Sequence, residues 1–213
     1  MDAARQGKKV IMVRSNSIIT AAARDEADRQ GITLSLETDI AVSPGVSAQP
    51  APAEKSSQIK SEEIKTIALG ADHGGFQMKE TLKQSLAEEG YTIIDVGTES
   101  ANPCDYPDFA YAVASLVSSG KAERGIMIDS VGVASAIVAN KVPGVRAVPC
   151  YDEFVARSSR EHNNANMLTL GSKILGIEMV KSIVRIWLVT PFAGGRHLPR
   201  VNKISDVEKR FLK

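Results

Sequence analysis

The sequence predicts an α/β fold, a doubly wound, Rossmann-like parallel sheet with helices on both faces, preceded by a small N-terminal module. Three observations predict it. Apolar segments of strand length alternate with helical patterns from residue 64 onward, a polar turn follows the first segment, and a Pro- and Ala-rich stretch precedes it. Strands that alternate with helices form βαβ units, which align the strands in parallel between two helical layers.

Each element of the larger region has its own signal. Apolar runs predict strands at 64–69, 91–96, 125–128, 145–148 and 167–170. Apolar side chains at helical spacing predict helices around Met78, Leu82 and Leu86, around Phe109, Val113, Leu116 and Val117, and around Met179, Ile183 and Trp187. A small-residue helix is expected near 134–140, and Asp152 is expected to cap a helix that runs to about His162. Ligands of such sheets bind at the carboxyl ends of the strands.

Composition divides the chain into three regions. Residues 43–63 are rich in Ser, Pro, Ala and charge and hold almost no large apolar side chains, which predicts a flexible linker. Residues 64–213 form the main domain, and residues 1–42 form the small module. About forty residues are marginal as an independent fold, so we expect the module to dock on its own main domain or on another protein.

The small module is predicted to have β-α-β-like order. Strands are expected at 9–13 and 32–36, and a helix at 20–30 lies between them. Thr20 is a suitable N-cap for this helix, and Gly31 is a suitable stop.

Composition also limits the partners. The 26 basic and 25 acidic side chains give a net charge of +1, so neither a nucleic acid nor a membrane surface is expected as a partner. No apolar run is long enough to cross a bilayer, and the N-terminus lacks the pattern of a secretion signal, which predicts a cytoplasmic protein. Cys104 and Cys150 lack C-x-x-C spacing and are expected to be reduced thiols. No Cys/His cluster has zinc-site spacing, so no metal is expected.

The three histidines of the chain lie in polar clusters that we expect at the ligand-facing ends of elements. His73 follows Asp72 after the first strand, His162 precedes the strand at 167–170, and His197 follows Arg196. Surface or capping roles are the alternative for each, because titratable side chains are common in loops.

Arg196 and Arg200 are four residues apart, so a helix would project both from one face. Two guanidinium groups side by side suit a phosphate or a carboxylate, because each offers paired donors to planar oxygens. A solvated basic face is the alternative.

Asp129-Ser130-Val131-Gly132 follows the central strand and opens the small-residue helix. Backbone N–H groups at such a position can hold an anion or a developing oxyanion. A plain strand–helix turn that Asp129 or Ser130 caps fits the sequence at least as well.

Together these segments resemble the ribose-5-phosphate isomerase B and galactose-6-phosphate isomerase family (LacAB/RpiB). The motifs occur in the family's order and spacing and cover essentially all of residues 64–213. They are GADHGGF at 70–76, DVGT at 95–98, DYP at 105–107, NKVPG at 140–144, REHNNAN at 160–166 and GGRH at 194–197.

The resemblance implies aldose–ketose isomerisation of a phosphorylated sugar, of the ribose-5-phosphate and ribulose-5-phosphate type, without metal or organic cofactor. It also implies a homodimer or tetramer whose active sites lie between subunits. By this resemblance Asp72 and His73 bind sugar hydroxyls and phosphate, His162 assists ring opening, Asn163 holds the substrate, Arg196 and Arg200 bind the phosphate across the subunit boundary, and Tyr106, Ser130 and Gly132 complete the substrate site.

One motif departs from the family pattern. In the family that this chain resembles, members typically present Cys-Gly-Thr-Gly-x-Gly after the central strand, and the Cys is the base. Here the Cys position is Asp129, the Thr position is Val131, and two glycines are replaced by Ser130 and Ala134. Another branch of the family has a Glu at the position of Ser135.

Three interpretations follow from this departure. Asp129 can itself be the catalytic base. Alternatively, the chain is the partner subunit of a Cys-bearing paralogue in a heteromeric isomerase, as in galactose-6-phosphate isomerase, whose A subunit resembles this chain in its Asp. In the third interpretation the domain binds sugar phosphates without converting them. Cys104 is a further candidate, as a relocated thiol.

The N-terminal module suggests a separate hypothesis. Residues 19–25 resemble short elements in proteins of bacterial microcompartment clusters. A docking element on a Pro- and Ala-rich tether suits a protein that is recruited to a microcompartment shell or to a partner enzyme. Packing of the module on its own domain is the alternative.

Overall fold

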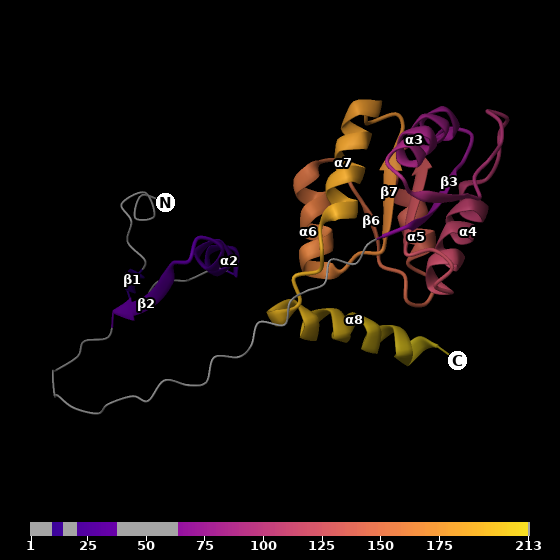
Figure 1. Cartoon of the computed structure of the whole chain (residues 1–213). Coiled ribbons are helices and arrows are strands. Elements are labelled where there is room, and N and C mark those ends of the chain that lie inside the picture. The colour runs from indigo at the N-terminus through magenta and orange to yellow at the C-terminus, as the bar shows by residue number, and fades with distance from the viewer. Residues whose placement is uncertain (1–9, 15–20, 38–63, 213) are drawn as a thin grey trace, which may run out of the picture. The chain divides into compact units, whose positions relative to one another are not determined.

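The computed structural model describes residues 10–14, 21–37 and 64–212, and the chain divides into two compact units, 1–57 and 58–213 (Figure 1). The predicted linker at 43–63 and the predicted cap Thr20 lie outside the described residues.

The described part of the smaller unit has β–α–β order. Strand β1 (Val10–Arg14) and strand β2 (Thr33–Glu37) pair in parallel, and α2 (Ala21–Arg29) lies between them in sequence. The helix ends where Gly31 adopts a φ of +67°, a conformation that glycine takes without strain. The backbone N–H of Ile32 then donates to the carbonyl of Ala27 at 2.8 Å, which closes the turn.

The larger unit is a five-stranded parallel sheet with the strand order β4-β3-β5-β7-β6. Its strands are β3 (Thr66–Ala71), β4 (Thr92–Asp95), β5 (Arg124–Asp129), β6 (Ala147–Pro149) and β7 (Met167–Gly171). Its helices are α3 (Phe76–Glu88), α4 (Tyr106–Ser118), α5 (Val133–Ala139), α6 (Glu153–Asn163), α7 (Ile177–Val189), the 3-10 turn η1 (Gly195–His197) and α8 (Leu198–Phe211). The predicted α/β fold class is confirmed.

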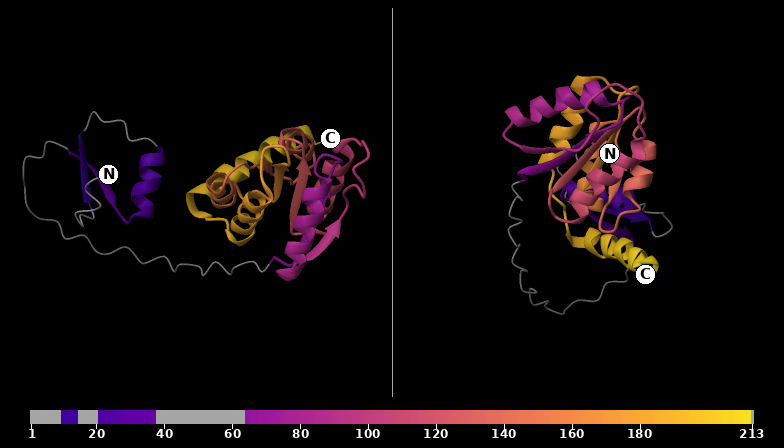
Figure 2. Two further views of the ribbon diagram at one scale, coloured as in Figure 1. Left: turned by 90° about the horizontal axis from the view of Figure 1, so that it is seen from above. Right: turned by 90° about the vertical axis from the view of Figure 1, so that its right-hand side faces the viewer.

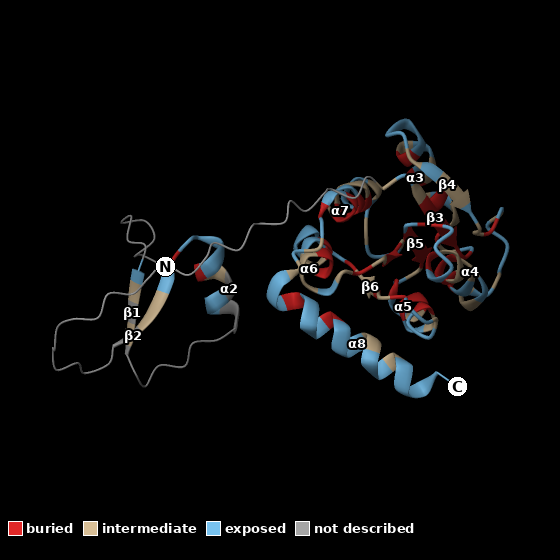
Figure 3. Ribbon diagram, turned by 60° about the horizontal axis from the view of Figure 1, so that its bottom comes forward, coloured by how far each residue is buried: buried red, intermediate tan, exposed pale blue. Residues whose placement is uncertain are grey.

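Helices cover both faces of this sheet (Figures 1 and 2). Successive strand side chains point to opposite faces, and β5 divides accordingly. Ile126 and Ile128 belong to a core with α3, α6 and α7, whereas Met127 belongs to a second core with α4 and α5. Trp187 is fully buried in the first core. Figure 3 shows the resulting buried residues along the sheet and the inner sides of the helices.

The strand order creates a switch point between β3 and β5. The chain runs from β3 outward to β4 and then returns past β3 to β5. The loops that follow β3 and β5 therefore leave the carboxyl end of the sheet in opposite directions. Ligands of open α/β sheets bind in the crevice that such a reversal leaves.

The edge strand β6 begins two residues later and ends one residue later than the predicted 145–148, and the Asn140 side chain bonds to its first residue. Its amide donates to the Ala147 carbonyl at 2.8 Å and accepts from the Ala147 N–H at 2.8 Å, which supplies the bonds of a missing neighbouring strand. Pro149 ends the strand because it has no N–H to donate. The predicted cap is confirmed at Asp152, which accepts from the Val155 N–H at 2.7 Å.

Helix α8 lies at the amino end of the sheet, away from the tips of the strand arrows (Figure 1). Val201 is buried, but most of the helix is exposed (Figure 3). None of the helices in the described ranges combines the length and the apolar composition needed to span a bilayer.

Candidate active site

The loop after β3 is folded by Asp72, which is 6% exposed. Its carboxylate accepts from the Gly75 N–H at 3.0 Å, and its own N–H donates to the Ile128 carbonyl at 3.3 Å. Gly75 is required here, because a Cβ at this position would lie 2.2 Å from the same Ile128 carbonyl oxygen. Asp72 is thus fixed at the switch point between β3 and β5.

Asp129 ends β5, and its side chain folds back onto its own loop. Oδ1 accepts from the Val131 N–H at 2.7 Å and from the Gly132 N–H, and Oδ2 accepts from the Ser135 N–H at 3.2 Å and from the Ser135 hydroxyl. Asp129 is 4% exposed. The carboxylate therefore caps the β5–α5 turn, as the capping alternative predicted, with both oxygens engaged.

Three loops meet at this edge of the sheet. The Ser172 hydroxyl donates to the Gly74 carbonyl at 2.7 Å, and the Ser172 N–H donates to the Asp129 carbonyl at 2.8 Å. Ser130 lies against the loop after β3, since a Cβ on Gly74 would stand 2.6 Å from the Ser130 hydroxyl. Gly132 adopts a φ of +89°, which lets the loop turn over β7. Asp72, Ser130 and Gly132 therefore lie in loops that contact one another at the carboxyl end of the sheet.

His73 extends from the same loop toward the β4–α4 connection. Its Nδ1 lies 3.1 Å from the Cys104 carbonyl oxygen, 3.2 Å from the Cys104 backbone nitrogen and 3.9 Å from the Cys104 sulfur. The predicted thiol candidate thus stands beside a predicted substrate-binding imidazole. Tyr106 begins α4 two residues later and packs against the core on the α4 face.

The other thiol, Cys150, is unsuited to acid–base chemistry. It is fully buried, and burial, together with the charge of Asp152, raises the pKa of this thiol to about 12. A bond with Ser159 offsets part of this rise. Both cysteines are free, as predicted.

A second group of predicted site residues gathers where α6 ends and α8 begins. The rings of His162 and His197 are stacked, with centroids 4.3 Å apart and planes inclined by 8°. The Arg196 Nε donates to the His197 Nε2 at 3.4 Å, and the Ser158 hydroxyl lies 3.2 Å from the His162 Nδ1. His197 is buried, whereas Arg196 is exposed.

Arg196 and Arg200 do not share one α-helix, which corrects the basis of their predicted pairing. Gly194 and Gly195 both have positive φ, +61° and +47°. They turn the chain so that Arg196 lies in the 3-10 turn η1, and α8 begins only at Leu198. Arg200 is exposed in the first turn of α8.

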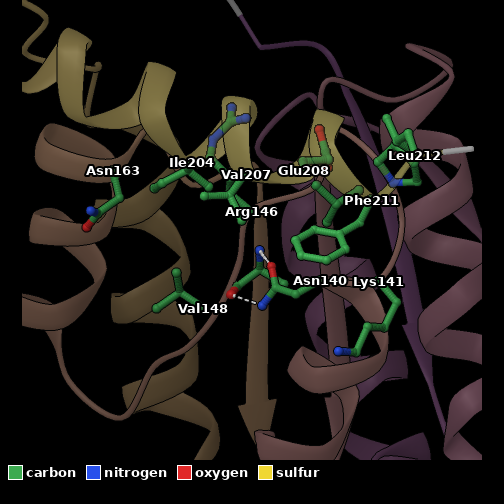
Figure 4. A pocket seen from close by; sticks show the side chains of 13 residues that line it. Asn140, Lys141, Arg146, Val148, Asn163, Ile204, Val207, Glu208, Phe211 and Leu212 are labelled. Carbon is green, nitrogen blue, oxygen red and sulfur yellow. Dashed lines mark hydrogen bonds between the residues drawn. The ribbon is translucent and has the colours of Figure 1, made fainter.

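Asn163 lines a groove of about 650 Å³ between α8 and the amino end of β6 (Figure 4). Figure 4 shows Ile204, Val207 and Phe211 of α8 facing the groove. These three side chains are large, apolar and about half exposed or more. The groove therefore joins a predicted substrate-binding residue to an uncovered apolar surface.

The two groups of site residues lie at opposite ends of the sheet. In the β5–β7 ladder, Asp129 pairs with Gly171 at the carboxyl end and Gly125 pairs with Met167 at the amino end. Four residues of strand separate these pairs by about 13 Å. His162 precedes Met167 and therefore lies beside the amino end, with the buried sheet between it and Asp129.

This arrangement corrects the expectation that all three histidines lie at ligand-facing strand ends. His73 does, but His162 and its stacked neighbour His197 lie at the other end. A helix that precedes a parallel strand ends at the amino side of the sheet, because the strand begins there. Neither His197 nor Ser158 was predicted to bind substrate or to act in catalysis, although Ser158 stands four residues before His162, the spacing of neighbours on a helix. Among the described residues, no group of three His, Cys, Asp or Glu side chains could hold a metal ion.

The fold and these two groups of residues define a sugar-phosphate isomerase-type α/β domain. A family model described as Ribose/Galactose Isomerase matches residues 67–204, and the chain belongs to this family. The resemblance predicted from the motifs is confirmed.

Individual relatives support the same conclusion. The chain is 44% identical to ribose-5-phosphate isomerase B of Escherichia coli over 147 residues, 69% of this chain and 99% of that protein. It is 42% identical to a LacA subunit of galactose-6-phosphate isomerase from Streptococcus pyogenes over 141 residues, 66% of this chain and 98% of that subunit. The solved structure of ribose-5-phosphate isomerase B from Clostridium thermocellum matches with a TM-score of 0.68 and 46% identity, over 69% of this chain and 99% of that chain.

Proposed function

We propose that the chain catalyses the aldose–ketose isomerisation of a phosphorylated sugar, of the ribose-5-phosphate and ribulose-5-phosphate type, with Asp129 as the base. The observation that carries this proposal is the place of the Asp129 carboxylate. It ends the central strand at the switch point, beside Asp72 and Ser130, where the family resemblance implies a thiol base. No organic cofactor is needed, because the reaction only moves one proton from C2 to C1 and another from O2 to O1.

The reaction begins with ring opening, in which His162 moves a proton between the anomeric hydroxyl and the ring oxygen. Asp129 then takes the proton from C2, and the electron pair forms the C1–C2 double bond while O1 becomes an oxyanion. Transfer of the O2 proton to O1 and return of the carbon proton to C1 give the ketose. The two carbons exchange oxidation states and nothing else is consumed.

The hydrogen bonds of Asp129 suit these reaction steps if the donors move from the carboxyl group to the substrate during the reaction. A carboxyl group that has gained a proton accepts hydrogen bonds more weakly than a carboxylate. The N–H groups of Val131 and Gly132, which bond Asp129 in the structure, would then become available to the oxyanion on O1. The Ser135 hydroxyl can rotate away and free Oδ2 for the C2 proton.

The proposal requires two chains for each active site. Asp72, His73 and Asp129 of one chain would act with His162, Asn163 and Arg196 of a second copy, because these groups lie at opposite ends of one sheet. The apolar groove beside Asn163 supports association, since large exposed apolar surfaces commonly mark protein interfaces. Arg196 and Arg200 would bind the substrate phosphate.

A second candidate function is favoured by one observation, the engagement of both Asp129 oxygens by the loop. If these bonds do not yield, the chain binds sugar phosphates without converting them alone. It would then act as the partner subunit of a Cys-bearing paralogue in a heteromer, or as a binding protein. The relative from Streptococcus pyogenes is itself named as a subunit.

An isomerase assay separates these functions. Purified wild-type chain is tested on a panel of aldose phosphates, beside Asp129→Asn and Asp152→Asn. Asp152 is the matched control, because its carboxylate also caps a helix that follows a strand. The proposal predicts wild-type activity, near-complete loss in Asp129→Asn and little change in Asp152→Asn. Equal activity of wild type and Asp129→Asn excludes Asp129 as the base.

Inactivity of the wild type alone, followed by activity on adding a Cys-bearing paralogue, would instead establish the heteromer. Inactivity in both cases, with ligand-induced thermal stabilisation, would establish a binding protein.

Recruitment through residues 1–42 is a separate proposal, for a microcompartment shell or a partner enzyme. It is tested by fusing residues 1–45 to a fluorescent protein. Unchanged localisation and unchanged partner binding would exclude recruitment.

A further inference from the structure

The His162 ring is held on two sides by different kinds of contact. The face of the ring stacks on His197 at 4.3 Å with nearly parallel planes. The edge of the ring meets Ser158, whose hydroxyl lies 3.2 Å from Nδ1. Ser158 and His162 are one helical turn apart on α6, and both are half-buried.

These two contacts constrain different motions. Stacking fixes the plane of the imidazole, but it still allows the ring to flip by 180° about the Cβ–Cγ bond. This flip keeps the plane and exchanges the positions of Nδ1 and Cδ2. A hydrogen bond to Nδ1 distinguishes the two orientations, because a carbon at that position cannot make it. The Ser158 hydroxyl therefore selects the orientation that the stack leaves open.

We propose that Ser158 is a positioning residue that holds Nδ1 of His162 and leaves Nε2 as the nitrogen that handles the sugar proton. This inference rests on the proposed function, in which His162 assists ring opening. The Ser158 hydroxyl has one proton and two lone pairs, so it can donate to a bare Nδ1 or accept from Nδ1–H. It thus remains bonded in either tautomer of the ring.

This property matches the chemistry of ring opening. The anomeric hydroxyl loses its proton, the bond between C1 and the ring oxygen breaks, the C1 carbonyl forms, and the ring oxygen gains a proton. A single Nε2 that accepts the first proton and returns it to the ring oxygen completes the exchange. Orientation of a histidine through its second nitrogen is a general means of assigning roles to the two nitrogens.

The first test reads the imidazole directly. Nitrogen NMR of the full chain follows its three histidines, and the signals of His162 are identified by their loss in His162→Asn. We expect Ser158→Ala to move the Nδ1 signal of His162. The control Ser119→Ala removes the C-cap serine of α4, whose hydroxyl donates to the Ser115 and Leu116 carbonyls, and it should leave that signal in place. An unmoved Nδ1 signal in Ser158→Ala overturns the proposal.

The second test separates ring opening from the later proton transfer. An aldopentose 5-phosphate closes a five-membered ring through O4, whereas an aldotetrose 4-phosphate cannot, because its O4 carries the phosphate. Ser158→Ala should lower kcat/KM for the pentose phosphate by roughly five- to tenfold, as expected for loss of one hydrogen bond, and spare the tetrose phosphate. Equal effects on both substrates overturn the assignment to ring opening.

The two tests also separate failure of this inference from failure of the proposed function. Unchanged activity of His162→Asn would remove His162 from the reaction, while the NMR result would still decide whether Ser158 orients the ring. If His162→Asn loses activity while Ser158→Ala changes neither the Nδ1 signal nor kcat/KM, the proposed function stands and the role of Ser158 is rejected.

Discussion

The Ser135 hydroxyl donates a hydrogen bond to the Asp129 carboxylate, and both side chains are buried at the end of the central strand. Ser135 belongs to the first turn of α5, so this bond ties the helix to β5. The same carboxylate also accepts from three backbone N–H groups of its loop. Whatever its role in catalysis, Asp129 holds the β5–α5 turn together.

Replacing Asp129 with Ala should therefore destabilise the fold. The substitution leaves several buried donors without an acceptor, and each such donor costs about 1–3 kcal/mol. Because the loop can relax and admit water, we expect a total loss of about 2–4 kcal/mol in the free energy of unfolding, measured by urea denaturation. Asp152→Ala, which removes the cap on the Val155 N–H, should lose only about 1 kcal/mol. Equal losses would contradict the structural importance assigned to the Asp129 loop.

Arg196→Ala should abolish the stabilisation that a sugar phosphate gives. Arg196 is exposed in the middle of η1, so its removal should hardly change the melting temperature of the free chain. A ligand at 100 times its Kd stabilises the folded state by about 2.7 kcal/mol, which thermal melting with ribose 5-phosphate would detect. The control Arg210→Ala removes an equal charge from the last turn of α8. Retained ligand stabilisation in Arg196→Ala would count against phosphate binding there.

The fold was predictable because the local hydrophobic patterns of the sequence agree with the strands of the observed sheet. Apolar runs fixed the strands of the main sheet, and the switch point follows from the βαβ order once the strands are paired. The loop at Asp129 was correctly expected to end the central strand. Its particular hydrogen bonds were not, because a capping Asp and a catalytic Asp have the same sequence signal.

The predicted site residues at the amino end of the sheet were harder to place from the sequence. His162 ends a helix and precedes a strand, and the direction of that strand decides which side of the sheet it occupies. The single α-helix expected to carry both Arg196 and Arg200 does not form, because Gly194 and Gly195 have positive φ and Arg196 lies in the 3-10 turn η1. Consecutive glycines signal a turn, whereas the four-residue spacing of the arginines signals a helix, so the two local signals conflict here.

Asp95→Asn should weaken the fold at neutral pH and remove part of its acid sensitivity. Lys79, whose side chain is 2% exposed, places its ammonium 2.6 Å from an Asp95 oxygen and 2.6 Å from a Glu80 oxygen. Burial tends to raise the pKa of Asp95, but bonds from Lys79 and Lys83 outweigh it and hold the pKa below its usual 3.8. Loss of this partner for a buried ammonium should cost roughly 2 kcal/mol at pH 7.

The sign of the pH effect follows from that lowered pKa. A carboxylate with a depressed pKa in the folded state stabilises the protein above its unfolded pKa, and the stabilisation is lost as pH falls through the folded pKa. Urea unfolding between pH 7 and pH 3 should show the wild type losing stability below about pH 4 more steeply than Asp95→Asn. Parallel curves would contradict the role of Asp95.

Alkylation of thiols at pH 8 should modify Cys104 and leave Cys150 intact. With the pKa of the Cys150 thiol raised to about 12 by burial, roughly one molecule in 10,000 carries a thiolate there at pH 8, and the buried sulfur is also inaccessible to reagent. Mass spectrometry after iodoacetamide treatment should show one adduct in the wild type, none in Cys104→Ser, and two in urea-unfolded wild type. Rapid modification of folded Cys104→Ser would mean that Cys150 reaches solvent. Because a thiol that stays protonated cannot accept the C2 proton, an inert Cys150 would exclude this thiol as the base and would agree with the assignment of that role to Asp129.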